Sequence, residues 1–194
     1  MDLEALVRLK RTIRAIGFDD APFVRRASEP VAVAGVVCAG TRFEGMVWTQ
    51  VQPDGWDATD TLSKTLLCSK FLPQVHVVLL DGISLAGFNV IDLPLLAKQI
   101  ERPCVSVMRR LPRMSAIEYA IRRLPEPERR LEMLQRAGSI HEYPPFYFQV
   151  FGAAPVITAA ALQQLTDRGH VPEALRLAHL ITAAVVKGES GRQA

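Results

Sequence analysis

The chain has 194 residues, of which 49% are apolar and 22% are charged, and its net charge is +3. This length and composition suit one globular domain over residues 1–194 and argue against intrinsic disorder. No apolar stretch approaches the roughly 20 residues of a membrane span, and the first residues lack the pattern of a signal peptide. We therefore expect a cytoplasmic protein, with buried thiols at Cys38, Cys68 and Cys104.

The first quarter of the chain predicts a short helix and three strands. Residues 3–11 have helical spacing and predict either a short helix or an edge arm. Apolar and alternating patterns predict strands at 14–19, 31–38 and 43–51. Because the connections between these strands are short, we expect an antiparallel meander of three strands.

After residue 52 the pattern alternates between helices and strands. A helix capped by Thr59 or Asp60 leads to an apolar strand at 75–82. A further helix and strand follow, and this spacing predicts right-handed crossovers and parallel pairing. The segments expected in the rest of the chain are a helix at 93–101, a strand at 103–108, helices at 115–123 and 126–137, a Phe- and Tyr-rich stretch at 143–151, and helices at 155–168 and 172–187. The order indicates an α/β protein whose mixed sheet is ribonuclease H-like, with three antiparallel strands, then parallel strands, and flanking helices.

Asp81 closes the apolar strand at 75–82 and is the most informative residue of the sequence. A buried charge is costly unless it is paired or bound to a metal, and open α/β sheets carry their chemistry at the C-terminal ends of strands. Asp19 and Asp57 also stand at element ends, so we expect the three carboxylates to converge. Such a group suits Mg²⁺, with Mn²⁺ as the alternative. The other interpretations are an acidic turn before Pro22 for Asp19 and a capping role for Asp81.

Positive charge is concentrated between residues 102 and 136, which contain nine Arg, no Lys and four Glu. This segment favours a phosphate-bearing substrate, with Arg109 and Arg110 as candidate contacts. The alternative is a helical hairpin with solvated Arg–Glu pairs.

Four stretches of the chain resemble the endonuclease dU (DUF99) family, which is related to endonuclease V. They lie at 16–23, 54–59, 80–92 and 172–190, and the stretch Ala86-Gly-Phe-Asn89 is the most specific. The resemblance spans residues 10–191. It implies metal-dependent cleavage of DNA at or near a deaminated base, with deoxyuridine as the named substrate.

The resemblance also implies roles for single residues. Gly17-Phe18-Asp19 looks like the Gly-x-Asp motif of endonuclease V, and Asp81-Gly82 looks like its Asp-Gly motif, so Asp19 and Asp81 inherit metal-ligand roles. Asp57 takes the place of the endonuclease V glutamate, with Asp54 or Asp60 as alternatives. The Pro-Tyr wedge of endonuclease V has no match in this sequence.

Further candidates surround these acids. His179 and Arg176 share a face of the last helix, where His179 would protonate the leaving group or contact the scissile phosphate, and Arg176 would contact substrate; a solvated face is the alternative. Asn89 is a candidate for reading a base edge, and Trp56 for stacking on a flipped base. We expect Asp92 to cap a helix, and Trp48 and His76 to belong to the core.

Three other functions stay open at this stage. The chain could keep the fold without catalysis and act as a nucleic-acid-binding protein, because fold does not fix function. The same metal chemistry also serves a nuclease of structured RNA. A small-molecule phosphohydrolase is less favoured, because the sequence has no Gly-rich phosphate loop.

Overall fold

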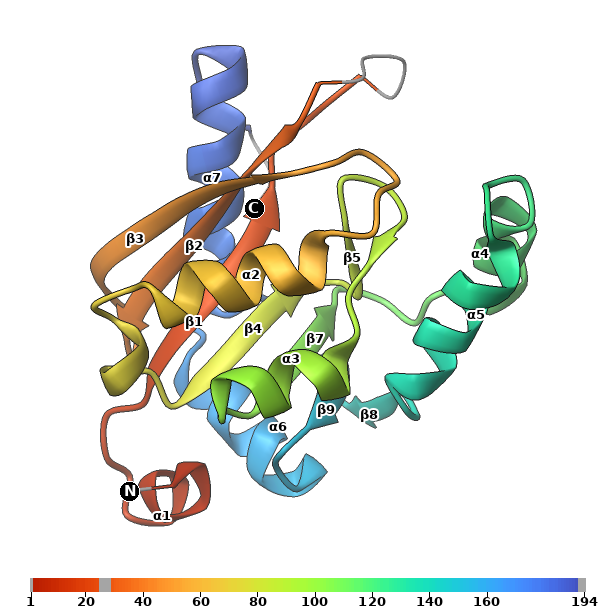
Figure 1. Cartoon of the computed structure of the whole chain (residues 1–194). Helices are drawn as coiled ribbons and strands as arrows, with labels where there is room; N and C mark the ends of the chain where they lie inside the picture. The colour runs from red at the N-terminus through yellow and green to blue at the C-terminus, as the bar shows by residue number, and fades with distance from the viewer. Residues whose placement is uncertain (1, 25–28, 192–194) are drawn as a thin grey trace.

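A seven-stranded mixed sheet forms the centre of the protein, in a computed structural model that describes residues 2–24 and 29–191 (Figure 1). The strands lie side by side in the order β3-β2-β1-β4-β7-β9-β8. Their bounds are β1 Arg14–Asp20, β2 Val31–Ala39, β3 Arg42–Val51, β4 Val77–Asp81, β7 Cys104–Met108, β8 His141–Tyr143 and β9 Phe146–Phe151. Two short strands, β5 (Ser84–Leu85) and β6 (Asn89–Val90), pair separately in the loop that follows β4.

The predicted mixed α/β sheet is confirmed. Strands β1, β2 and β3 form the antiparallel meander, and β1, β4 and β7 are parallel. The Phe- and Tyr-rich stretch forms β8 and β9, which extend the sheet in antiparallel pairing beyond β7. Because β1, β4 and β7 run in the same direction, their C-terminal ends meet at one edge of the sheet.

Helices cover both faces of this sheet. In Figure 1, α2 and α3 lie on the near face, α6 and α7 lie behind the sheet, and the hairpin of α4 and α5 stands to one side of it. The helix bounds are α1 Leu3–Arg8, α2 Ala58–Leu67, α3 Leu93–Ile100, α4 Met114–Ile121, α5 Pro127–Arg136, α6 Pro155–Gln164 and α7 Glu173–Lys187, with a 3-10 turn η1 at Leu72–Gln74. No helix in the described part of the chain is long and apolar enough to cross a membrane.

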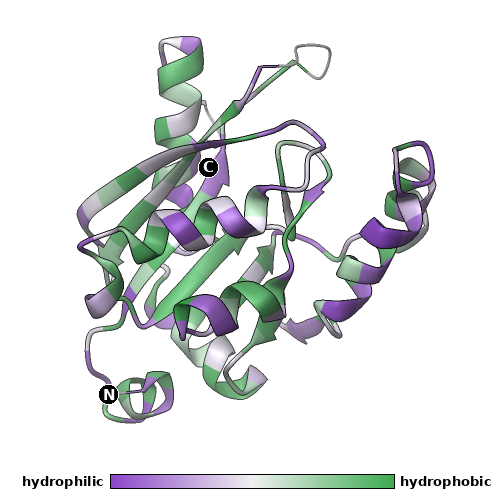
Figure 2. Cartoon of the chain, viewed as in Figure 1, coloured by the Kyte–Doolittle hydropathy of each residue, from purple (hydrophilic) through white to green (hydrophobic). Residues whose placement is uncertain are grey.

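Side chains alternate in direction along the central strands, so the hydrophobic core is divided between the two faces of the sheet. On β1, Ile16 and Phe18 pack toward α2 and α3, whereas Ala15 packs toward the opposite layer. On β4, Leu80 belongs to the first cluster and Leu79 to the second. Figure 2 shows the resulting hydrophobic colour along the central strands. Burying each such leucine side chain stabilises the fold by about 1.5 to 3 kcal/mol.

The predicted cap of α3 is confirmed, and the predicted cap of α2 is wrong. Asp92 caps α3 by accepting a 3.1 Å hydrogen bond from the Leu95 amide, as expected. Asp57, and not Thr59 or Asp60, stands at the N-cap of α2, and its side chain makes no capping hydrogen bond there.

Burial differs from the expectation at two residues. Trp48 is 41% exposed, because β3 is an edge strand and its outer positions have no neighbouring layer. Cys68 is exposed just after the last turn of α2, whereas Cys38 and Cys104 are buried as expected. His76 is half-buried, and its Nδ1 accepts a 2.9 Å hydrogen bond from the Arg14 amide, which fits the core role.

Candidate metal centre

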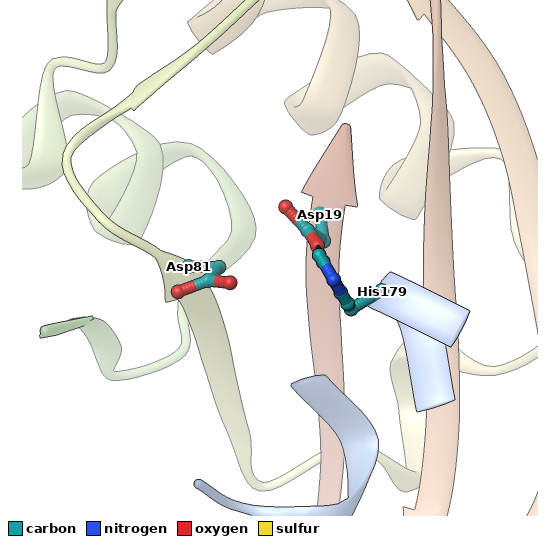
Figure 3. Close-up of side chains that lie close together, drawn as sticks. All are labelled: Asp19, Asp81 and His179. Carbon is teal, nitrogen blue, oxygen red and sulfur yellow. Dashed lines mark hydrogen bonds and ion pairs between the residues drawn. The ribbon is translucent and has the colours of Figure 1, made fainter. Parts of the chain in front are cut away.

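Asp19, Asp81 and His179 form a cluster at the C-terminal edge of the parallel strands (Figure 3). Asp19 comes from β1, Asp81 ends β4 and His179 comes from α7. One ligand atom from each residue lies within 4.8 Å of the other two. The predicted convergence of Asp19 with Asp81 is therefore found, and His179 completes the group.

Strand periodicity explains why these side chains meet. Side chains alternate between the faces of a strand, so Asp19 shares its face with Gly17, and Asp81 shares its face with Leu79. That face is the one covered by α7. A Cβ atom added to Gly17 would lie 2.7 Å from backbone atoms of Ala174 and Leu175. The glycine of the Gly-x-Asp pattern thus lets α7 approach β1 closely enough for His179 to reach Asp19.

Asp19 is the buried member of the cluster, with 6% of its surface exposed. Its Oδ2 lies 2.8 Å from Nδ1 of His179, and its Oδ1 accepts a 2.9 Å hydrogen bond from the Asp20 amide. Burial, together with repulsion from Asp81 and Asp20, raises the pKa of Asp19 to about 8. A cation placed between the carboxylates would relieve both costs.

Asp81 is less buried and is balanced by a neighbouring arginine. Its Oδ2 lies 3.2 Å from Nη2 of Arg109, which follows β7 at the same edge. Arg109 therefore lies beside the cluster, and its predicted contact with substrate phosphate stays a prediction. Arg110 is exposed next to it.

The sequence interpretation missed the role of Asp20. Burial raises the pKa of the Asp20 carboxyl to about 6, and the backbone N–H of Ala86 donates a hydrogen bond to it. The Ala86 carbonyl accepts a 2.9 Å hydrogen bond from the Asp54 amide. Ala86 thus links the end of β1 to the turn at 52–57. Positive φ angles at Ala86 (47°) and Asp54 (48°) show that this junction holds a strained backbone.

The prediction that Asp57 joins Asp19 and Asp81 is wrong in this structure. Among the described residues, the cluster consists of the two acids and His179, without Asp57. Asp57 precedes α2, which covers the face of the sheet opposite α7. Its carboxylate instead accepts hydrogen bonds from the Gln52 amide at 3.1 Å and from the Asn89 side chain at 2.6 Å.

Asn89 likewise has a structural position. It is fully buried, donates to the Gln52 carbonyl at 2.9 Å and accepts from the Ala58 amide at 3.0 Å, in addition to its bond with Asp57. The Asn89 amide therefore joins two loops of the protein, and its predicted contact with a base edge stays a prediction.

Trp56 is also engaged within the protein. The guanidinium carbons of Arg129 and Arg130 lie 4.2 and 4.1 Å from its ring centroid. The Trp56 ring therefore packs against arginine side chains, and its predicted stacking on a flipped base stays a prediction.

Arg130 anchors α5 to the turn that contains Trp56, and the Arg-rich pattern of residues 102–136 does not distinguish it from the exposed Arg129. The side chain is buried and donates to four backbone carbonyls, among them Gly55 at 3.2 Å and Asp54 at 2.5 Å. The other two belong to Pro125 and Phe88. These hydrogen bonds of Arg130 fix the hairpin of α4 and α5 against the loops that border the site.

Arg176 is paired with an acid of its own helix. It forms a bidentate pair with Glu173 one turn earlier on α7, at 2.6 and 2.8 Å. This pair raises the pKa of Arg176, and its next charged neighbour is Asp167. Glu173 therefore engages the Arg176 guanidinium in the structure, and the predicted substrate contact at Arg176 stays a prediction.

The donor set fits a hard divalent cation. Two carboxylates supply oxygen ligands, and the raised pKa of Asp19 shows that the site holds its negative charge poorly without a counter-ion. An imidazole is compatible with Mn²⁺ as well as with the softer first-row ions. The third carboxylate expected from the sequence is absent from this cluster, so water or substrate oxygens would complete the coordination.

The comparisons with known proteins agree on a family. The model of the family described as "Endonuclease dU" matches residues 11–186. A UPF0215 protein of Methanopyrus kandleri is 35% identical over 195 residues, covering 97% of this chain and 99% of its own. A UPF0215 protein of Deinococcus radiodurans is 38% identical over 184 residues, covering 94% of each chain.

Solved structures extend the likeness to endonuclease V. A protein of unknown function from Archaeoglobus fulgidus has a TM-score of 0.84 and 34% identity, and the match covers 89% of this chain and 98% of that one. Endonuclease V of Ciona intestinalis, in complex with a DNA containing an inosine followed by a ribo-adenosine, has a TM-score of 0.60 and 13% identity, over 96% and 95% of the two chains. At that identity the second likeness establishes the endonuclease V fold, which the sequence predicted.

Proposed function

Because this chain belongs to the endonuclease dU family, we propose that it is a metal-dependent endonuclease that cleaves DNA at or near a deaminated base, with deoxyuridine as the favoured substrate. The observation that carries the proposal is the meeting of Asp19, Asp81 and His179 within 4.8 Å at the strand edge. Family membership and the endonuclease V fold support nuclease chemistry. The choice of DNA and of deoxyuridine rests on the family's description.

Asp19 and Asp81 are the residues that would hold Mg²⁺ or Mn²⁺. Such an ion supplies Lewis-acid stabilisation of the charge that develops on the phosphodiester during hydrolysis. The two strand ends fix the carboxylates rigidly, so little ordering is required when the ion binds. Asp81 would exchange its contact with Arg109 for the ion, which leaves the Arg109 guanidinium next to the scissile phosphate.

His179 is suited to proton transfer. Its Nδ1 is held by Asp19, which orients the ring and leaves Nε2 as the nitrogen available to a substrate. The side chain is 31% exposed, so its free edge is accessible from the surface. We assign His179 the role of protonating the leaving oxygen, while Arg109 and Arg110 contact phosphate groups of the substrate.

A cleavage assay on matched duplexes tests this proposal. Labelled duplexes of one sequence carry deoxyuridine, hypoxanthine or normal bases, and each is incubated with Mg²⁺, Mn²⁺ or EDTA. We expect cleavage near the deaminated base with either ion and none in EDTA, and loss of activity in Asp81→Ala. Binding without cleavage under every condition would support an inactive binding protein instead, and preferential cleavage of structured RNA would support the RNA nuclease.

A further inference from the structure

A basic surface extends from the metal cluster along α4, beyond the two arginines used above. We call residues 109–123 the α4 strip. It contains five Arg and one Glu, so its net charge is +4. The strip starts at Arg109, beside Asp81, and continues along the hairpin that stands away from the sheet (Figure 1). A nucleic acid held at the cluster can therefore extend onto the start of the strip at Arg109.

The arginines of the strip differ from those of α5 in their partners. On α5, Arg129 pairs with Glu126 at 3.2 Å and Arg136 pairs with Asp92 at 2.9 Å. Within the part of the chain that the structure describes, four strip arginines have no acidic group within 4.0 Å: Arg110, Arg113, Arg122 and Arg123. All four are exposed. Unneutralised guanidinium groups at this density suit a polyanion.

The strip also exposes large apolar side chains among these charges. Tyr119 is 61% exposed, Leu111 is 51% exposed and Met114 is 41% exposed. The guanidinium of Arg123 lies 4.3 Å from the Tyr119 ring centroid and donates a hydrogen bond to its hydroxyl. An exposed ring with an arginine stacked on it is the kind of platform on which unpaired bases stack.

We propose that the α4 strip binds an unpaired nucleic-acid strand that adjoins the cleavage site. Phosphate groups of any nucleic acid would satisfy the arginines, but the outside of a duplex offers no apolar surface to Tyr119 or Leu111. Unstacked bases do offer it. The inference rests on the proposed function and deepens it, because it names the form of the substrate: a strand opened next to the lesion.

Binding measurements in EDTA test the strip without any cleavage. Fluorescence anisotropy compares a labelled 20-nucleotide single strand with the duplex of the same sequence over a salt series. We expect Tyr119→Ala to weaken single-strand binding about tenfold, with duplex binding changed less than about twofold, and Tyr119→Phe to retain most of the affinity. Arg122→Ala/Arg123→Ala should lower the slope of log affinity against log salt by about 1.4 for the single strand.

A double variant of equal charge change serves as the control. Arg8 and Arg168 have side chains that are 72% and 93% exposed on α1 and after α6, so Arg8→Ala/Arg168→Ala removes two charges elsewhere. It should leave the slope within experimental error of the unmodified protein. Wild-type binding by Tyr119→Ala, or an equal fall in slope in the control, would overturn the inference. If the strip variants behave as expected but no DNA is cleaved, the proposed nuclease function fails and the binding surface stands.

Discussion

Nδ1 of His179 and Oδ2 of Asp19 lie 2.8 Å apart, although the two residues are 160 positions apart in the chain. The contact joins the last helix to the first strand of the sheet and brings an imidazole to the most buried acid of the cluster. Because burial and neighbouring acids raise the pKa of Asp19 to about 8, its carboxyl is mainly protonated at neutral pH when no metal is bound.

Metal binding should therefore release a proton at pH values below about 8. The ion must displace the proton of Asp19, so we expect Mn²⁺ affinity to rise by up to about tenfold per pH unit below that value and to level off above it. Calorimetry in two buffers of different ionisation enthalpy counts the protons released. Affinity that does not change with pH would contradict the assignment of Asp19 as a ligand.

Asp19→Asn should stabilise the metal-free protein while abolishing cleavage. The pKa of Asp19 is raised from 3.8 to about 8, so its contribution to stability is fully present below about pH 4 and is lost as the pH rises through 8. At pH 8 or above, the neutral amide removes a buried charge, and we expect the free energy of unfolding to rise by about 1 to 2 kcal/mol. Urea denaturation in EDTA measures this change, and a decrease would refute the prediction.

Gly17→Ala should separate α7 from β1. The added methyl group meets backbone atoms at 2.7 Å, and neither main chain can move without disturbing the core, so we expect a loss of about 1 to 3 kcal/mol in stability. The rate of cleavage should fall by more than the loss of folded protein accounts for, because His179 moves away from Asp19. Gly45→Ala is the control: its methyl group meets the Phe71 ring at 2.6 Å, in a part of the sheet remote from the cluster. Equal activity in the two variants, measured well below their unfolding temperatures, would argue against this coupling.

Asp57 and Asp81 should respond differently to removal of their charge. Asp57→Asn keeps an oxygen acceptor for the Gln52 amide, and the residue lies outside the cluster, so we expect Mn²⁺ affinity within about threefold of the unmodified protein. Asp81→Asn should weaken it by at least about tenfold, because a ligand charge is lost. Titration of Mn²⁺ by electron paramagnetic resonance compares the two variants. Equal losses of Mn²⁺ affinity in the two variants would indicate that Asp57 also binds the metal.

Arg130→Met should release the hairpin from the loops. Four backbone carbonyls lose their donor, and we expect a loss of about 3 kcal/mol. In a Trp48→Phe background Trp56 is the remaining tryptophan, so its emission reports the local change. Arg129→Met is the matched control: the side chain contacts the same ring but is 58% exposed, so its removal should cost less than about 0.5 kcal/mol. A stable Arg130→Met protein with unchanged Trp56 emission would contradict this account.

Most of the fold could be predicted from the sequence, because the pattern of apolar residues indicates which strands are buried. The run ending at Asp81 is apolar on both faces, and in the structure it lies between two helical layers. The helix boundaries were less accurate: α2 begins at Ala58, one residue before Thr59. Asp57 stands at its N-cap, but the Asp57 side chain accepts from the Gln52 amide and the Asn89 side chain and does not cap the helix.

The candidate site was predicted only in part, for a geometric reason. Asp19 and Asp81 are at strand ends whose directions follow from the parallel pairing, so their convergence could be inferred. The position of Asp57 depends on which face α2 covers, and periodicity along a single helix does not specify that face. The pairing of Arg176 with Glu173, one helical turn earlier, could have been proposed from the sequence spacing, but the contact itself is visible only in three dimensions.

The close approach of α7 to β1 has a consequence for how the protein is made. The cluster needs a residue from β1, one from β4 and one from α7, and α7 is synthesised after both strands. A nascent or prematurely terminated chain that lacks residues 173–187 carries the two acids without their histidine. Assembly of the complete cluster therefore waits until residues 173–187 have been synthesised and have packed on β1.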